Sequence, residues 1–216
     1  MNETKIRHFS NCCFDGTTEP FVFTSQMTSH KFDLAAMKGD LASVEAFCRY
    51  GTKCTTKAMD WAAMEGHLDV VVLLHNQGKK CSSEAVDKAA TFGHLSVVQF
   101  LVDVRKEVPT KEAVEGAAAN GHEKVLRFLF CNSRAQSERA LDMAAEQGHL
   151  DCVVFLFYIA RKDPSERAIV GATKNGHPDV VNFLLDKTEQ KRSWIRKAKR
   201  STTDISMKQL FAARGY

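Results

Sequence analysis

The sequence has no long apolar run. Its longest apolar stretch covers residues 152–160, which is too short for a membrane helix of about 20 residues. Residues 1–30 also lack the continuous apolar segment of a signal peptide. We therefore expect no transmembrane segment and an intracellular protein, located in the cytoplasm or, as the alternative, in the nucleus.

Close cysteine pairs are missing too. The chain has 7 cysteines, an odd number, and no CxxC pair. Zinc sites typically use such pairs, and the disulfide frameworks of small secreted domains use an even number. We therefore interpret the cysteines as reduced thiols and expect neither a metal site nor a cofactor.

The motifs of common enzyme classes are absent as well. There is no HExxH metal motif, no Walker glycine loop and no GxSxG nucleophile elbow. An acidic residue does recur in one column of the sequence, but a catalytic pair must converge on one substrate, so we interpret this column as structural or solvated. Its members are Asp33, Asp60, Asp87, Glu115 and Asp142. We expect no catalytic residue, no small-molecule substrate and no enzymatic activity.

What the sequence does contain is an internal repeat. Six glycines recur at intervals of 27 or 28 residues, most of them followed by His: Gly39, Gly66, Gly93, Gly121, Gly148 and Gly176. Each unit predicts two helices, the first of which ends at the glycine, because a left-handed residue there is least costly as Gly. Hydroxyl residues stand at capping positions before the first helices: Thr55, Ser82, Thr110, Ser137 and Ser165. Since isolated helices shorter than ~12–15 residues are marginal in water, the units must stack into a solenoid.

The segment AMDWAAMEGHLDVVVLLHNQGKKCSSEAVDKAATFGHLSVVQFL resembles ankyrin repeats through its A-A-x-x-G-H-L-x-V-V-x-x-L core. The usual ankyrin repeat has about 33 residues and opens with T-P-L-H, so the chain resembles a short-repeat subtype whose β-hairpin fingers are reduced to turns. The resemblance implies an all-α fold, an ankyrin-like helical-hairpin solenoid of about six repeats with a C-terminal capping helix.

The domain organisation follows from the glycine register. We expect an irregular flank over residues 1–27 and six repeats over residues 28–187, with boundaries near 28–54, 55–81, 82–109, 110–136, 137–164 and 165–187. Residues 188–203 are predicted to be a basic insertion. Residues 204–216 are predicted to be a capping half-repeat with Gly215 in the glycine column, or else a fortuitous amphipathic helix.

The histidines that follow the repeat glycines suggest a metal site at first sight. They are His67, His94, His122, His149 and His177. Stacked helices lie ~8–10 Å apart, whereas zinc–nitrogen bonds are ~2.0–2.1 Å, so successive histidines cannot share one ion. We expect each imidazole instead to hydrogen-bond to the backbone of the turn between helices.

The resemblance also implies that the first helices line a concave face on which another protein binds. Large apolar residues of the kind that anchor interfaces occur in the columns expected to face it, and Gly116 and Ala119 predict a shallow spot beside them. The alternative is that Trp61 and Phe92 pack between units. The expected binding residues are Trp61, Met64, Glu65, Lys88, Thr91, Phe92, Asn120, Glu146 and Gln147. The predicted function is a non-catalytic scaffold for protein–protein interaction.

A basic run near the C-terminus supports a second hypothesis. It consists of Lys191, Arg192, Arg196, Lys197, Lys199 and Arg200, in a segment that holds the excess positive charge of a chain whose net charge is +4. Three interpretations stay open: a solvated helical extension, a nuclear-import or acidic-partner signal, and a surface for nucleic acid or anionic membrane.

Overall fold

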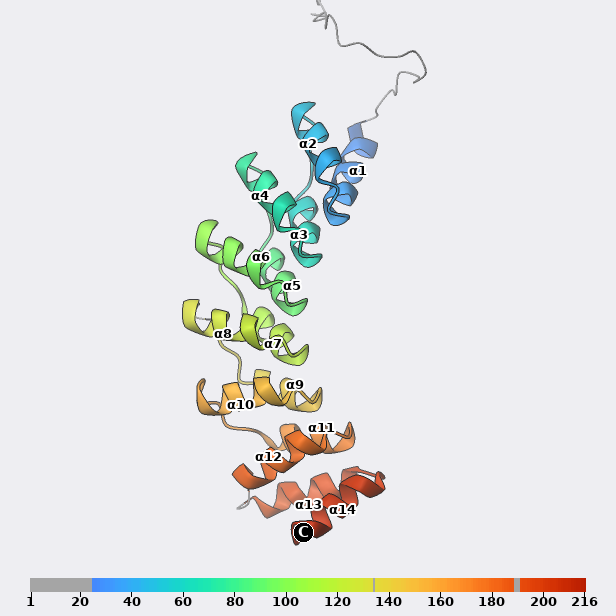
Figure 1. The fold of residues 1–216 in the computed structure, drawn as a ribbon, viewed down its shortest axis with the longest axis vertical. Helices are drawn as coiled ribbons and strands as arrows, with labels where there is room; N and C mark the ends of the chain where they lie inside the picture. Colours follow the sequence, from blue (N-terminus) through green and yellow to red (C-terminus); the bar gives the residue numbers. More distant parts are fainter. Residues whose placement is uncertain (1–24, 134, 189–190) are drawn as a thin grey trace, which may run out of the picture.

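The computed structural model describes residues 25–133, 135–188 and 191–216 (Figure 1), so residues 1–24 of the predicted flank lie outside it. The described chain is a series of short helices connected by turns and loops, and its described residues contain no β-strand. The helices are α1 (Ser25–Met37), α2 (Leu41–Arg49), α3 (Lys57–Met64), α4 (Leu68–Asn76), α5 (Glu84–Thr91), α6 (Leu95–Gln99) with the π-helical turn η1 (Phe100–Val104), α7 (Lys111–Ala119), α8 (Glu123–Asn132), α9 (Ala140–Glu146), α10 (Leu150–Tyr158), α11 (Glu166–Lys174), α12 (Pro178–Thr188), α13 (Arg192–Ser201) and α14 (Ile205–Ala213).

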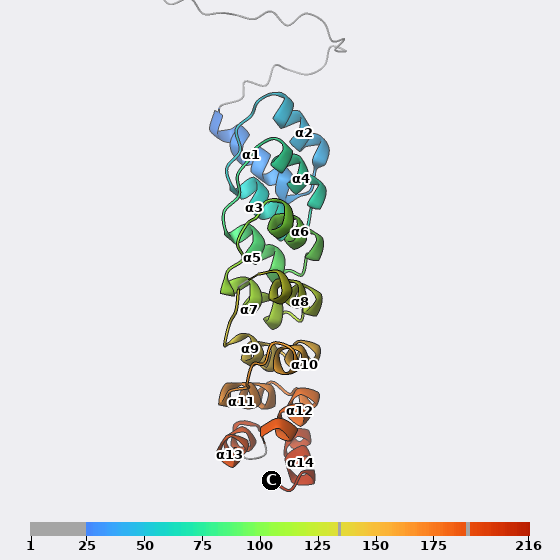
Figure 2. The same cartoon turned by 90° about the vertical axis from the view of Figure 1, so that its left-hand side faces the viewer.

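The helices form antiparallel pairs that stack into one elongated column. The odd-numbered helices are the first helices of the pairs and form one row, and the even-numbered second helices form the other row (Figure 2). Each first helix packs against the first helix of the next pair. The column bends gently (Figure 1). The prediction of an all-helical solenoid of stacked helix pairs is confirmed for the described residues.

Alanine pairs on the first helices let neighbouring pairs approach closely. Ala62 and Ala63 of α3 and Ala89 and Ala90 of α5 have no exposed surface. The second helices supply larger apolar side chains, such as the fully buried Leu74. Because a helix of about ten residues cannot bury its apolar face alone, this continuous core between pairs is what holds each helix in place.

The repeat glycine is required by the backbone and by the space around it. Gly93 ends α5 with φ +82°, a left-handed conformation that favours Gly. A Cβ at Gly93 would lie 2.5 Å from Nδ1 and 2.8 Å from Cγ of His122, the histidine of the following pair. The same packing of a histidine ring on the preceding glycine recurs from Gly39 to Gly148. The glycine of one pair and the histidine of the following pair therefore connect successive pairs.

The difference between 27-residue and 28-residue units lies at the end of the second helix. In two 27-residue units a backbone bond spanning five residues closes this end, as between the Lys79 N–H and the Leu74 carbonyl, 3.0 Å. In the two 28-residue units the bond spans six residues, from Glu107 to Leu101 and from Lys162 to Leu156. The extra residue is thus absorbed in a wider turn.

The C-terminal end differs from the expected insertion. The basic run forms α13, which packs against α11 and buries Ile195 and Ala198. It therefore takes the place of a first helix, and α14 that of a second helix. Gly215, with φ +77°, follows α14, so it ends a second helix and does not belong to the glycine column. We propose the six repeat boundaries given above for residues 28–187, followed by this seventh pair.

The seventh pair escaped the sequence analysis because α13 carries no A-A-x-x-G-H signature. In α13 only Ile195 and Ala198 are fully buried, and the five basic residues of the helix are exposed. α13 therefore contacts the preceding pair through a narrow apolar side and exposes its charged residues.

Candidate functional site

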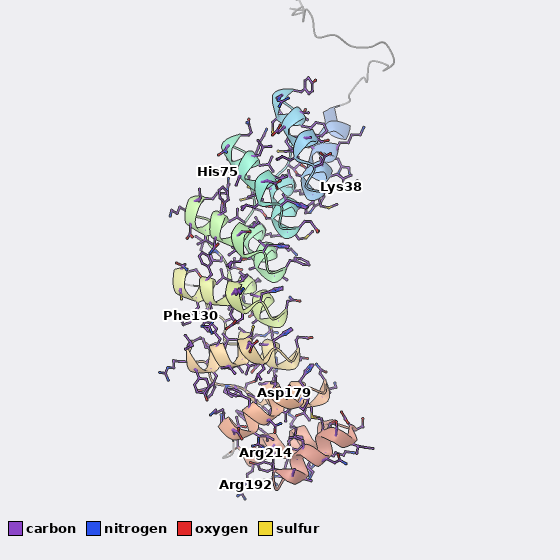
Figure 3. All side chains as sticks on the ribbon, viewed as in Figure 1. Lys38, His75, Phe130, Asp179, Arg192 and Arg214 are labelled. Atoms are coloured by element: carbon purple, nitrogen blue, oxygen red, sulfur yellow. The ribbon has the colours of Figure 1, made fainter. Side chains whose placement is uncertain are left out.

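The bend of the column gives the repeat array an inner side. Lys38, one residue before the first repeat glycine, lies on that side, whereas His75 and Phe130, at the ends of second helices, lie on the opposite side (Figure 3). We define the inner face as the positions five, two and one residues before each repeat glycine, on the first helices. The predicted binding residues all occupy these positions.

A carboxylate of one pair fixes the start of the first helix in the next. The Thr110 N–H donates to Asp87 Oδ1 at 3.0 Å, and its hydroxyl donates to Asp87 Oδ2 at 2.9 Å. The same hydroxyl accepts a bond from the Glu112 N–H at 3.1 Å, as a helix cap does. Burial raises the pKa of Asp87, and the two bonds from Thr110 oppose that change.

Equivalent contacts occur along the whole acidic column. They join Thr55 to Asp33, Ser82 to Asp60, Ser137 to Glu115 and Ser165 to Asp142. Of the two interpretations of the acidic column, structural or solvated, these contacts support the structural one, and the partners are the five predicted capping hydroxyl residues. The first helices, which carry the inner face, are therefore fixed to one another at regular intervals.

Phe92 is the clearest candidate contact residue on the inner face. Its side chain is 53% exposed. The described residues include other large exposed apolar side chains, but among these Phe92 is the one that lies at the end of a first helix, next to the repeat glycine. Such exposure does not fit the alternative that Phe92 packs between units. Large apolar groups exposed on a surface often mark interaction sites.

Trp61 and Met64 are less accessible than Phe92. Both are half-buried. Trp61 lines an open depression of about 390 Å³ together with Asp33 and Lys57, and the Lys57 ammonium lies 5.6 Å from the centre of the indole ring. The indole is therefore partly covered by its own helix and partly open to a ligand.

The polar residues predicted for the inner face divide into two groups. Those with exposed side chains are Glu65, Lys88, Asn120, Glu146 and Gln147. Thr91, in contrast, is half-buried and donates its hydroxyl hydrogen bond to the Asp87 carbonyl at 2.7 Å. A Cβ at Gly116 would overlap this hydroxyl. The expected shallow spot at Gly116 is thus wrong, because Thr91 fills the space that the glycine leaves.

The repeat histidines serve the packing between pairs. Burial lowers the pKa of His122, while a hydrogen bond to the backbone of Thr91 opposes this shift. Thr91 lies at the end of the first helix of the preceding pair, so the bond connects neighbouring pairs. Within the described ranges, no group of three or more His, Cys, Asp or Glu side chains is arranged to hold a metal ion.

The six residues of the basic run are all exposed, but four of them have partners within the chain, among them Arg196, which donates to the Arg192 carbonyl at 3.4 Å. The Lys191 ammonium lies 3.9 Å from the centre of the Trp194 ring. Lys197 forms an ion pair with Glu166, and Lys199 donates to the carbonyl of Tyr216 at 2.6 Å. The run therefore does not present six unengaged charges on one side.

Sequence reasoning missed a cluster of aromatic residues on the second helices. Phe157 and Tyr158 of α10 contact Phe183 of α12, with ring centres 5.7 and 6.0 Å apart. The Lys187 ammonium lies 5.4 Å from the Tyr158 ring centre. The high apolar content of α10 was visible in the sequence, but nothing in it showed that these rings meet across two pairs.

The stacked helix pairs define a helical repeat solenoid, and comparisons with known proteins give its family. Two family models, described as "Ankyrin repeats (many copies)" and "Ankyrin repeats (3 copies)", match residues 59–102 and 114–194. Together they match more than half of the chain, which therefore belongs to the ankyrin-repeat family. No helix in the described part of the chain is long and apolar enough to cross a membrane.

Solved structures agree on the fold. The chain is similar to the human ASB11 ankyrin repeat domain, whose crystal structure matches with a TM-score of 0.67 at 17% identity and covers 85% of this chain and 96% of that one. At such low identity the similarity concerns the fold alone. The search of curated proteins found no match.

Proposed function

We propose that the chain is a non-catalytic scaffold that binds another protein on its inner face, centred on Trp61, Met64 and Phe92. Ankyrin repeats generally mediate protein–protein interactions. The observation that carries the proposal for this chain is the exposure of Phe92, 53%, at the end of α5 and one residue before Gly93, the position equivalent to that of Lys38.

The geometry of stacked helices supports one contact area around these residues. Trp61 and Met64 lie on α3, and Phe92 follows α5, the first helix of the next pair. Neighbouring helices pack ~8–10 Å apart, so a single partner segment is able to touch all three side chains. The loops between pairs are short and contain no strand in the described residues, so no hairpin finger covers this area.

Nucleic acid or an anionic membrane, bound through residues 191–200, is the second candidate. The exposure of the six basic residues favours it. However, four of the six residues already contact groups of the chain itself: Lys191, Arg196, Lys197 and Lys199. We therefore favour the protein partner, and we propose an intracellular site of action, cytoplasmic or nuclear, because the described cysteines are free thiols.

The test uses Phe92→Ala with Tyr50→Ala as its matched control. Tyr50 is also an exposed aromatic residue, 86% accessible, but it follows a second helix. A partner recovered from a native extract by the unmodified chain is identified by mass spectrometry, purified, and titrated against each variant. We expect Phe92→Ala to weaken binding at least tenfold, because truncation of an interface anchor costs about 2 kcal/mol or more, and Tyr50→Ala to leave it unchanged.

The same variants are melted to separate binding from folding. An exposed side chain contributes little to the core, so the melting temperature of Phe92→Ala should stay close to that of the unmodified chain. Equal affinity of the two variants for the partner would refute the proposed contact area. A melting temperature that falls together with the affinity would place Phe92 in the core.

A further inference from the structure

The inner face changes character at its C-terminal end. Ile195 and Ala198 of α13 are buried three positions apart, in the same way as Ile169 and Ala172 of α11. This register places Lys197 and Arg200 of α13 in the columns that Gly171 and Lys174 occupy in α11. Lys174, Lys197 and Arg200 are all exposed. Part of the basic run is therefore a continuation of the inner face.

In the described chain, α11 and α13 are the one pair of successive first helices whose inner-face positions carry three charges of the same sign. In the preceding pairs the charged residues of the inner face are Lys38, Glu65, Lys88 and Glu146, so the sign alternates along the column. On α11 and α13 the inner-face positions carry three basic residues, Lys174, Lys197 and Arg200, and no acidic residue. Positive charge concentrated on one part of a surface attracts and orients an acidic partner.

We propose that Lys174, Lys197 and Arg200 bind an acidic segment of the partner protein. This inference rests on the proposed function and extends it, because it names the chemistry of the partner at one end of the inner face. The partner would contact Phe92 with an apolar side chain and these three residues with Asp or Glu side chains.

The helix spacing sets the distance between the two halves of such a partner. Phe92 follows the first helix of the third pair, and Arg200 lies on that of the seventh, four steps away. At ~8–10 Å for each step, the two sites are about 32–40 Å apart. An extended chain covers ~3.3–3.6 Å for each residue, so the acidic residues would follow or precede the apolar anchor by about 9–12 positions.

One carboxylate of the chain already contacts this basic patch. Glu166, the first residue of α11, forms an ion pair with Lys197, and both side chains are substantially exposed, 37% and 65%. Exposed ion pairs of this kind contribute little to stability, so a partner carboxylate is able to replace Glu166. Glu166 is therefore a competitor of the proposed ligand and provides a specific test.

A protein segment fits the patch better than nucleic acid does. The patch has three basic residues, and Glu166 reaches into it, whereas the affinity of a protein for nucleic acid depends on the number of phosphates that its Lys and Arg side chains neutralise. Three basic residues therefore offer nucleic acid few contacts.

The probe is a fluorescein-labelled decaglutamate peptide, titrated by fluorescence anisotropy at low salt. The test variant is Lys174→Gln/Lys197→Gln/Arg200→Gln. The control, Arg192→Gln/Arg196→Gln/Lys208→Gln, has the same net charge and removes exposed basic residues of α13 and α14 outside the inner face. We expect the test variant to lose at least tenfold in affinity and the control less than threefold, with both melting at the temperature of the unmodified chain. Glu166→Gln should bind the peptide more tightly than the unmodified chain.

Three results would overturn the inference: no binding of decaglutamate, equal losses in the two triple variants, or tighter binding of a labelled oligothymidylate than of the peptide at the same salt. In each case the effect of Phe92→Ala on the partner protein is measured separately. If Phe92→Ala still weakens that complex, the proposed function stands and only the acidic segment is rejected.

Discussion

The dual role of the repeat glycine makes a quantitative prediction about Gly93→Ala. Gly93 has φ +82°, and a left-handed conformation costs a non-glycine residue about 1–2 kcal/mol. The added methyl group would also lie 2.8 Å from Cγ of His122, which is the atom at the base of the ring, so the ring as a whole must move. Overpacking of this kind costs about 1–3 kcal/mol. We therefore expect a total loss of about 2–5 kcal/mol in the free energy of unfolding.

Gly78→Ala separates the two contributions. Gly78 has φ +66°, but a Cβ there would meet nothing within 4 Å, so only the conformational cost of about 1–2 kcal/mol applies. Both variants are unfolded in urea and followed by circular dichroism. In a His122→Ala background, the cost of Gly93→Ala should decrease to that of Gly78→Ala. If Gly93→Ala costs no more than Gly78→Ala in the unmodified chain, the histidine ring does not pack on the glycine.

Three further predictions concern stability. Ala90→Leu should lower the free energy of unfolding by about 1–3 kcal/mol in urea titrations, because Ala90 has no exposed surface; a smaller loss would place Ala90 outside the contact between pairs. Since burial lowers the pKa of His122 below 6.5, the unfolded chain takes up a proton first as the pH falls, and stability should decrease from pH 7.5 towards pH 5.5. His122→Gln should flatten this slope, and an equally steep slope in that variant would exclude His122 as its cause. EDTA should leave the melting temperature unchanged, and a lower melting temperature would reveal a bound metal.

The repeated part of the fold could be predicted because its determinants are local and recur. The positions of Gly66, Gly93 and their equivalents gave the ends of the first helices, and the buried alanine pairs gave the face that stacks. The acidic column was interpreted as structural or solvated. Its partners, such as Thr110 for Asp87, were identified only as helix caps, because a contact between residues 23 positions apart is not visible in the sequence of a single unit.

The seventh pair could not be predicted on the same grounds. Its first helix lacks the glycine and the alanine pair, and only Ile195 and Ala198 mark its buried side. Basic residues dominate the sequence of residues 191–200. A run of basic residues occurs equally in a solvated helix, a linker or a nuclear-import signal, so it does not predict a packed helix. Once α11 provides a surface to pack on, however, two buried side chains are sufficient to orient α13.

For the candidate site, sequence reasoning gave the columns of the inner face but not the accessibility of their members. Phe92 and Thr91 occupy adjacent positions, yet Phe92 is exposed and Thr91 is half-buried against Gly116. The difference arises from the close approach of α5 and α7, which Gly116 permits. Accessibility at each position therefore depends on the residue that the next pair places opposite it.

This dependence explains how a regular array can carry a specific site. The glycines, the histidines and the acidic column fix the distance and orientation between pairs, and they vary little from unit to unit. Some inner positions contact the neighbouring pair, as Gly116 does with Thr91, whereas others carry exposed side chains that can vary without loss of packing. Phe92 and Arg200 are both residues of this second kind, exposed on first helices that are fixed elsewhere. A rigid scaffold with variable inner positions loses little conformational entropy on binding, so a few such residues are sufficient to select a partner.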